Sequence, residues 1–207
     1  AIHPSENNVM FNHKKFNVMR NLLIAVSFLT ACTLQAQRHQ TIFGDLNVVG
    51  AFGSPIVEIS SINGESISDV GGGGALILED FFIGWYGLGN DLAKVSVSQE
   101  LYDIRFKHNG FWLGYVPKSY KVAHLYGSAR IGWGRTELRQ SKQTFYSDRV
   151  FVMTPELGVE FNVFDFFKLA VTGGYRWVNG VDRLPSELDN KSFSSPVGTF
   201  TFRLGGF

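Results

Sequence analysis

Two histidines, His108 and His124, are the side chains best suited to acid–base chemistry, because an imidazole changes its charge close to neutral pH. A lipid hydrolase or acyltransferase would need a serine beside one of them. The G-x-S-x-G pattern does not occur, no spacing ties a serine to either histidine, and no metal-ligand spacing stands out. We therefore predict a protein that is not an enzyme, with no catalytic, cofactor-binding or metal site. A lipid-modifying enzyme that uses the two histidines is the alternative.

The glycine-rich run GGGGALIL, residues 71–78, has the composition of a phosphate-binding loop. It lacks the Lys-Ser/Thr ending of such a loop, and no helix start follows it. Glycine inside a strand permits a bend or a close approach of another backbone. The run therefore predicts a curved strand that packs against a filled interior.

Eight charged residues lie on the polar faces of otherwise apolar segments and form a candidate network in the interior. They are Arg105, Lys107, Arg130, Glu156, Glu160, Lys168, Arg176 and Arg203. Because an unpaired buried charge is very costly, each is expected to meet a charge of opposite sign. Glu156 and Glu160 share one face of one segment and are expected to pair with cations of neighbouring segments. We predict a plug of ion pairs that seals the interior, with a narrow channel as the alternative.

Alternation of apolar and polar residues indicates that β-strands position these side chains. In residues 167–178, apolar side chains at odd positions alternate with Lys168 and Arg176 at even positions. The pattern predicts about eight strands, near residues 46–60, 66–78, 81–90, 101–116, 124–139, 150–163, 167–178 and 196–207. Ten strands are the alternative, although each would then be short of residues. Strands of roughly 10 to 14 residues exceed the usual five or six and suit a membrane crossing.

The connections between these strands alternate in length. Short turns are expected near Glu79, Pro117 and Asp165, whereas the connections at residues 90–100, 139–149 and 179–195 are long and polar. Short turns at one end and long loops at the other are typical of outer-membrane β-barrels. The first connection, around SINGES, is short and departs from this contrast.

These observations predict an all-β fold, a closed antiparallel up-and-down transmembrane β-barrel. A sheet in hydrocarbon must close on itself, because each unpaired backbone group there costs several kcal/mol. Its outward face should be apolar and ringed by aromatic side chains. The predicted aromatic girdle consists of Trp112, Tyr115, Phe167, Tyr175 and Trp177. A soluble, lipocalin-like periplasmic barrel that binds an apolar ligand is the alternative, with the two faces exchanged.

The N-terminal segment has the features of a cleavable export signal. The basic stretch HKKFNVMR precedes the apolar run NLLIAVSFLTACTL, and QAQ follows as a cleavage site. Cleavage after Ala36 divides the chain into upstream residues and signal peptide, 1–36, and a barrel domain, 37–207. The stretch LTAC also fits lipidation at Cys32, the only cysteine. Cleavage after Ala36 would leave no cysteine and therefore no disulfide framework.

Composition supports these predictions and excludes a nucleic-acid partner. Charged residues make up 18% of the chain, against about 25% in typical soluble domains, and the chain contains 19 Phe and 23 Gly. The net charge is +1 and the predicted barrel domain contains no dense basic run. No nucleic acid is therefore expected as a partner.

The C-terminal stretch GTFTFRLGGF resembles the last strand of outer-membrane barrel proteins, which typically ends in Phe. In that family the barrel-assembly machinery reads the terminal strand, which implies an assembly signal at Phe207. Phe207 is odd-numbered, whereas the preceding apolar residues of the strand are even-numbered, so we expect a bulge at Gly205–Gly206 to bring them onto one face.

Residues 41–207 as a whole resemble small eight-stranded barrels such as the membrane domain of outer-membrane protein A. The resemblance implies export through a Sec-type signal to the outer membrane of a Gram-negative bacterium. It implies a location rather than an activity. We predict outer-membrane lipid and the barrel-assembly machinery as partners, and a structural, adhesion or surface-interaction role. An extracellular partner would bind through loops 90–100, 139–149 and 179–195.

Overall fold

The computed structural model describes residues 47–90, 93–97, 100–140, 143–185 and 187–207. The predicted signal peptide, the cut after Ala36 and Cys32 lie outside the described residues. Within the described ranges the secondary structure is almost entirely β. The elements are β1 Val48–Ile62, β2 Glu65–Leu78, β3 Phe81–Gly89, β4 Ala93–Val97, β5 Glu100–Tyr115, β6 Ala123–Gln140, β7 Gln143–Phe164, β8 Phe167–Asn179, α2 Asn190–Phe193 and β9 Ser195–Gly206. No helix in these ranges is long and apolar enough to cross a membrane.

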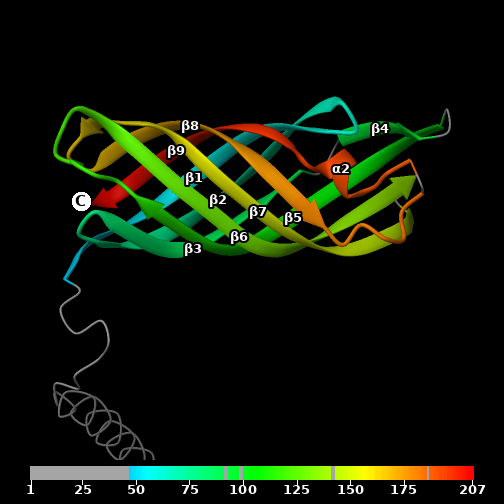
Figure 1. The fold of residues 1–207 in the computed structure, drawn as a ribbon, viewed down its shortest axis with the longest axis horizontal. Helices are drawn as coiled ribbons and strands as arrows, with labels where there is room; N and C mark the ends of the chain where they lie inside the picture. Colours follow the sequence, from blue (N-terminus) through cyan, green and yellow to red (C-terminus); the bar gives the residue numbers. More distant parts are fainter. Residues whose placement is uncertain (1–46, 91–92, 98–99, 141–142, 186) are drawn as a thin grey trace, which may run out of the picture. The chain divides into compact units, whose positions relative to one another are not determined.

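Eight of the strands form a closed antiparallel ring (Figure 1). Each strand pairs with its neighbour along the chain, β3 pairs with β5, and β9 returns to pair with β1. The predicted eight-stranded fold is therefore confirmed, and the ten-stranded alternative is wrong. Closure leaves no open sheet edge around the ring, as a structure surrounded by hydrocarbon requires.

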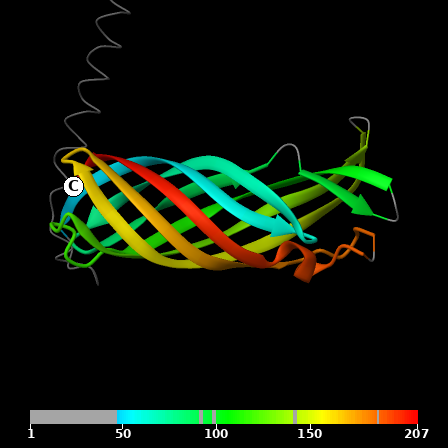
Figure 2. The same cartoon turned by 90° about the horizontal axis from the view of Figure 1, so that it is seen from above.

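The two ends of the barrel differ as the connection lengths predict. Short turns join β2 to β3, β5 to β6 and β7 to β8 at the end where β9 finishes, whereas α2 and β4 lie at the other end in both views (Figures 1 and 2). The segment 90–100, predicted as a loop, contains β4, which pairs with β5 beyond the end of β3. The segment 139–149, also predicted as a loop, continues β6 and β7 as a hairpin.

Side chains fill the interior in three layers. The lower apolar layer, at the short-turn end, contains Phe52, Phe82, Trp112 and Tyr126 among others. The upper apolar layer, at the loop end, contains Ile104, Phe106, Leu138 and Phe193 among others. Buried polar and charged side chains lie between these layers. An eight-stranded barrel is just wide enough for side chains to fill it, so this packing leaves the lumen closed.

Inward glycines create the space for the large aromatic rings of the interior. A Cβ on Gly73 would lie 3.1 Å from Trp112 and 2.6 Å from the Trp85 carbonyl oxygen. A Cβ on Gly114 would lie about 2 Å from the ring of Phe82, where no real Cβ fits. The glycine-rich segment of β2 is thus a strand against a filled interior, as its sequence predicts.

Candidate functional site

The centre of the lumen is a matched set of ion pairs around Glu58. The carboxylate of Glu58 accepts hydrogen bonds from Arg130 and, at 3.0 Å, from Arg176. Arg176 also donates to Asp69 at 2.8 Å, and the two arginines come from β6 and β8, the two strands that flank β7 in the sheet. All four side chains are almost completely excluded from solvent. Each arginine therefore joins strands that are distant in sequence, and each charge has a partner of opposite sign.

Glu156 on β7 extends this set toward the short-turn end. It lies 3.0 Å from Arg130 and accepts hydrogen bonds from the hydroxyls of Thr199, Ser128 and Thr172. Three hydroxyls and one guanidinium thus satisfy a single buried carboxylate. A buried charge is tolerated when it is both paired and hydrogen-bonded in this way.

A second ionic cluster lies near the short-turn end. Glu160 pairs with Arg203 on β9 and, at 3.0 Å, with the Nε2 of His124. Arg203 stacks 3.8 Å from the centroid of the Phe52 ring, and the ammonium of Lys168 lies 4.2 Å from the centroid of Phe207. Aromatic faces attract cations where water is excluded, so these rings stabilise the two cations at this end of the lumen.

The structure brings together six of the eight charged residues predicted for the interior network. They are Arg130, Glu156, Glu160, Lys168, Arg176 and Arg203, all buried. The placement of Arg105 and Lys107 in the lumen is wrong: both lie on the outer face of β5, where Arg105 is 3.9 Å from Glu137. The inward positions of that strand instead belong to Ile104, Phe106 and His108, because the interior at this level is apolar.

Sequence reasoning missed two carboxylates of the network, Glu58 and Asp69. Each is the only charged residue in the middle of an otherwise uncharged strand stretch. The predicted set also held six cations against two carboxylates, an imbalance that a sealed lumen does not tolerate. That imbalance is the signal that would have directed attention to these two acids.

The aromatic girdle differs from its prediction at one position. Tyr115, Phe167, Tyr175 and Trp177 have the outward parity of their strands, and Tyr175 packs against Trp177 with ring centroids 5.0 Å apart. Trp112 was assigned to the girdle wrongly, since it is 1% exposed and lies among the rings of the interior. The space above Gly73 accommodates its indole. Trp85 and Trp133, which the sequence reasoning did not include, are outward and exposed.

The expected bulge at Gly205–Gly206 is absent from the described register of β9. Pairing with β1 runs without a shift from Gly198 to Gly206. The ring of Phe207 consequently lies on the inward side, where it packs with Phe52 at a centroid distance of 6.2 Å. It therefore forms part of the lower apolar layer rather than of the lipid-facing surface.

Neither histidine lies in a catalytic arrangement. His108 is buried in the lumen, with Nδ1 3.1 Å from the hydroxyl of Tyr86. His124 bridges Glu160 and the carbonyl oxygen of Lys121, 2.9 Å away. Both imidazoles thus have structural partners inside a closed barrel. Among the described residues no cluster of His, Cys, Asp and Glu could hold a metal ion.

The segment between β8 and β9 forms an ordered cap over the loop end of the lumen. The inward carboxylate of Asp148 accepts three backbone hydrogen bonds, from Asp182, Arg183 and Leu184, at 2.8–3.2 Å. Leu184, Leu188 and Phe193 are buried in the upper apolar layer as a result. The cap therefore closes the lumen from above.

A short helix completes this cap. Asp189 is the N-cap of α2 and accepts a hydrogen bond from the backbone N–H of Ser192, whose hydroxyl accepts one from Asp189 in return. The hydrogen bond from that backbone N–H holds the pKa of the Asp189 carboxyl below its usual range. The helix end is thus fixed in place beside the upper apolar layer, which contains the buried Phe193.

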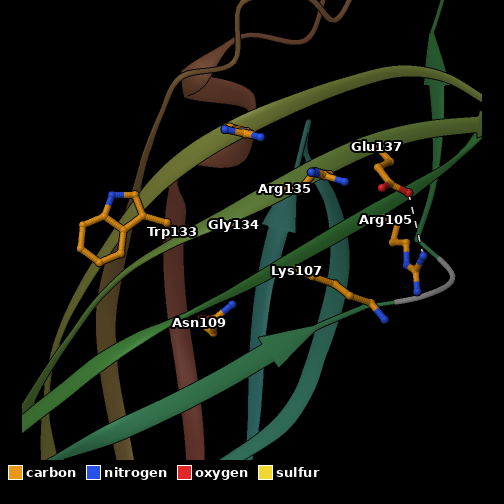
Figure 3. A pocket seen from close by; sticks show the side chains of 8 residues that line it. Arg105, Lys107, Asn109, Trp133, Gly134, Arg135 and Glu137 are labelled. Carbon is orange, nitrogen blue, oxygen red and sulfur yellow. Dashed lines mark ion pairs between the residues drawn. The ribbon is translucent and has the colours of Figure 1, made fainter.

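A hollow of about 500 Å³ lies on the outer wall, over the loop-side halves of β5, β6 and β7. We call it the cationic hollow. Its lining residues are Arg105, Lys107, Asn109, Trp133, Gly134, Arg135, Glu137 and Arg149 (Figure 3). Four of these side chains are cationic and one is a carboxylate. Positive charge therefore gathers in a concavity of the outer wall.

No protein-family model and no curated relative matches the chain. Among solved structures, that of Neisserial surface protein A aligns with a TM-score of 0.50 at 11% identity, over 75% of this chain and 93% of that one. Ail, the attachment invasion locus protein of Yersinia pestis, aligns with a TM-score of 0.45 at 16% identity, over 77% of this chain and 98% of that one. The structure of Ail in complex with the heparin analogue sucrose octasulfate aligns with a TM-score of 0.43 at 18% identity, over 75% of this chain and 96% of that one. The likeness to Neisserial surface protein A concerns the fold, and the class that it defines is the small transmembrane β-barrel.

Proposed function

We propose that the chain is a closed outer-membrane β-barrel of a Gram-negative bacterium with an adhesion or other surface-interaction role. The observation that carries this proposal is the sealed lumen: a matched ionic layer lies between two apolar layers, under an ordered cap. A barrel without a path through it offers two surfaces for function, its outer wall and its loop end. Because the outer wall faces lipid, an extracellular partner would bind at the loop end.

The distribution of polarity supports membrane placement over the soluble alternative. Leu157, Val159 and Phe161 are exposed in a row on β7, and Phe111 and Leu113 are exposed on β5. A soluble barrel would bury such residues and expose its charges. Here the middle of the wall shows the opposite, since Glu58, Arg130 and Arg176 are buried inside it while these large apolar side chains are exposed outside.

Export and assembly follow from the same proposal. A Sec-type signal in residues 1–36 would direct the chain out of the cytoplasm, with cleavage after Ala36 or lipidation at Cys32. The barrel-assembly machinery would then read the terminal strand with Phe207, and outer-membrane lipid would surround the barrel. No nucleic acid, cofactor or catalytic step is part of the proposal.

The extended β6–β7 hairpin is the part of the loop end best suited to contact a partner. Leu138 pairs with Tyr146 whereas Arg139 pairs with Thr144, so Phe145 is the extra residue of a β-bulge. Bulges redirect a side chain. Phe145 and Tyr146 are 55% and 44% exposed at this tip, and exposed aromatic residues are enriched at protein interfaces. The loops at 90–100 and 179–195 would flank this contact.

The test combines placement, conductance and attachment. Cells that express the protein are fractionated, and the purified protein is compared by gel migration before and after boiling and by conductance in planar bilayers. We expect the outer-membrane fraction, a heat-dependent shift in migration and no conductance. A steady ion current would instead support the narrow channel, and release by osmotic shock without detergent would support the soluble barrel.

The attachment arm uses intact cells on surfaces coated with extracellular-matrix proteins. The variant Phe145→Ser/Tyr146→Ser is expected to lower attachment at least several-fold at equal surface amounts. Tyr120→Ser/Val122→Ser is the control, since it removes two exposed apolar side chains, which are 79% and 76% exposed, at the short-turn end. Equal attachment by the two variants would contradict a role of the hairpin tip.

A further inference from the structure

Three cations form a continuous row across the cationic hollow. In the strand register Lys107 on β5 is directly opposite Arg135 on β6, which is directly opposite Arg149 on β7. All three side chains are exposed, and their neighbours on either side along each strand are less exposed or buried. Directly opposed residues on one face have Cβ atoms about 5 Å apart. The row therefore concentrates three positive charges on one side of the wall.

An anion bound between these cations would stabilise the arrangement. Like charges directly opposite each other on a sheet destabilise the pairing. The hollow contains one carboxylate, that of Glu137, and it is shared with a fourth cation, Arg105, at 3.9 Å. Its net charge is thus strongly positive, and its volume of about 500 Å³ accommodates a ligand group. Guanidinium groups bind phosphate oxygens in pairs, which suits a phosphorylated ligand.

The position of the row along the barrel indicates where that ligand comes from. One step toward the short-turn end, the outward positions are Asn109, Trp133 and Phe151, in the same cross-strand order. Trp133 and Phe151 are in edge-to-face contact, with ring centroids 6.1 Å apart. Aromatic side chains of this kind mark the boundary between hydrocarbon and headgroups. The cations consequently lie at headgroup depth.

Below the aromatic pair the wall is apolar. Phe111, Ile131 and Met153 occupy the next outward positions of the same three strands. A single vertical strip therefore presents cations, then aromatic rings, then apolar side chains. This order matches a lipid with a phosphorylated headgroup and acyl chains, and a water-soluble polyanion would use only its upper part.

We propose that the cationic hollow binds the phosphorylated headgroup of an outer-leaflet glycolipid, the chemistry of lipid A. Arg135 and Arg149 would hold a phosphate at the centre of the row with Lys107, while acyl chains lie along the strip below. The proposal rests on the outer-membrane placement proposed above. The proposal adds a specific lipid partner on the outer wall, a surface different from the loop end where an extracellular partner would bind.

The test measures lipid binding by the whole protein in nanodiscs of phosphatidylcholine. The probe is lipid A with both phosphates, and the same lipid without phosphates is the comparison. Bound lipid is counted by native mass spectrometry, and the urea midpoint of unfolding is measured with and without it. The hollow variant is Lys107→Gln/Arg135→Gln/Arg149→Gln. The control variant, Lys121→Gln/Arg183→Gln/Lys191→Gln, removes the same charge from exposed positions outside the hollow.

We expect the hollow variant to bind phosphorylated lipid A on the order of a hundredfold more weakly at low salt, since each surface cation contributes about 1 kcal/mol to binding an anionic lipid. The control variant should bind as the original protein does. Without phosphorylated lipid the hollow variant should be at least as stable as the original, so a loss of binding is not a loss of folding.

Equal binding by the hollow and control variants would overturn the proposal, as would equal binding of the lipid without phosphates. A sulfated oligosaccharide that binds in the hollow while the phosphorylated lipid does not would assign the hollow to a soluble polyanion. Heat-dependent gel migration, run on every sample, separates these outcomes from a failure of membrane placement. A protein that stays soluble without detergent would contradict the proposed function itself.

Discussion

The inner and outer sides of the barrel wall treat the same residue types differently. Inside, Arg130 and Arg176 are buried and share the carboxylate of Glu58, and each also has a second acid. Outside, the exposed Arg135 and Arg149 stand opposite each other in the register. The inner cations are matched charge for charge, whereas the outer cations are grouped with like charges.

The difference follows from the surroundings of each side. In the lumen the protein itself must supply every counter-charge, because the removal of one partner leaves an uncompensated buried ion. On the outer wall, water, salt and lipid headgroups supply counter-charge, so like charges can be grouped there at a modest cost. The inner network is therefore a structural element, and the outer row is suited to hold an external ligand.

The largest effect on stability is expected when an inward and an outward aromatic residue are each removed. The comparison tests the difference between the two sides of the wall. Trp112→Ala removes an indole from the lower apolar layer and should lower the free energy of unfolding by about 4 kcal/mol, since the surrounding rings cannot fill the cavity. Trp133→Ala removes an outward indole that is 55% exposed, with an expected loss of about 1 kcal/mol. Urea unfolding in lipid vesicles measures both.

If Trp112→Ala fails to fold, fluorescence quenching provides an independent way to locate the two indoles. In lipids with brominated acyl chains, a protein that keeps Trp112 alone, through Trp85→Phe/Trp133→Phe/Trp177→Phe, should show little fluorescence quenching. A protein that keeps Trp133 alone should be quenched strongly. Similar quenching of both would mean that Trp112 faces lipid after all.

The next largest effect is expected at the centre of the ionic layer. Glu58→Gln removes the charge that Arg130 and Arg176 share, and should lower the free energy of unfolding by about 3 kcal/mol. The value is at the lower end for a broken buried pair, because each arginine keeps a second carboxylate.

The matched substitution on the outer wall is Glu137→Gln, which removes the carboxylate near Arg105. Because that pair is 3.9 Å apart and partly exposed, its loss should change stability by less than about 0.5 kcal/mol. The two variants are compared in one urea titration. Equal effects would show that the lumen is hydrated enough to screen its charges, and would remove the basis for the sealed plug.

The strands and their closure were predictable from the sequence because they depend on local alternation. The faces of β5 were not. From Phe111 to Tyr115 this strand is apolar on both faces, so alternation gives no reason to send Phe111 outward and Trp112 inward. The choice depends on the space above Gly73, two strands away in the sheet. Such a contact is visible only when the strands are assembled.

The sites divide in the same way. The six predicted residues that the structure places in the interior lie in strands with a clear polar face. Arg105 and Lys107 were placed inside because the two faces of β5 were exchanged in the prediction. The cationic hollow was beyond prediction, because it depends on the register of three strands. Neither Arg135 nor Arg149 stands out in the sequence as a neighbour of Lys107, from which they are separated by 28 and 42 positions.

The smallest effect is also the one that separates the two sides of the wall most directly. Arg135→Glu replaces two like-charge contacts, with Lys107 and Arg149, by two contacts of opposite charge. In phosphatidylcholine alone the free energy of unfolding should rise by about 0.5 kcal/mol, and the gain should disappear at 1 M salt because the contacts are exposed. In membranes that contain phosphorylated lipid A the same variant should be less stable than the original, since its binding energy is lost. A substitution that stabilises the barrel in one lipid and destabilises it in another marks a ligand site. The same sign in both lipids would mean that the row is only a tolerated repulsion.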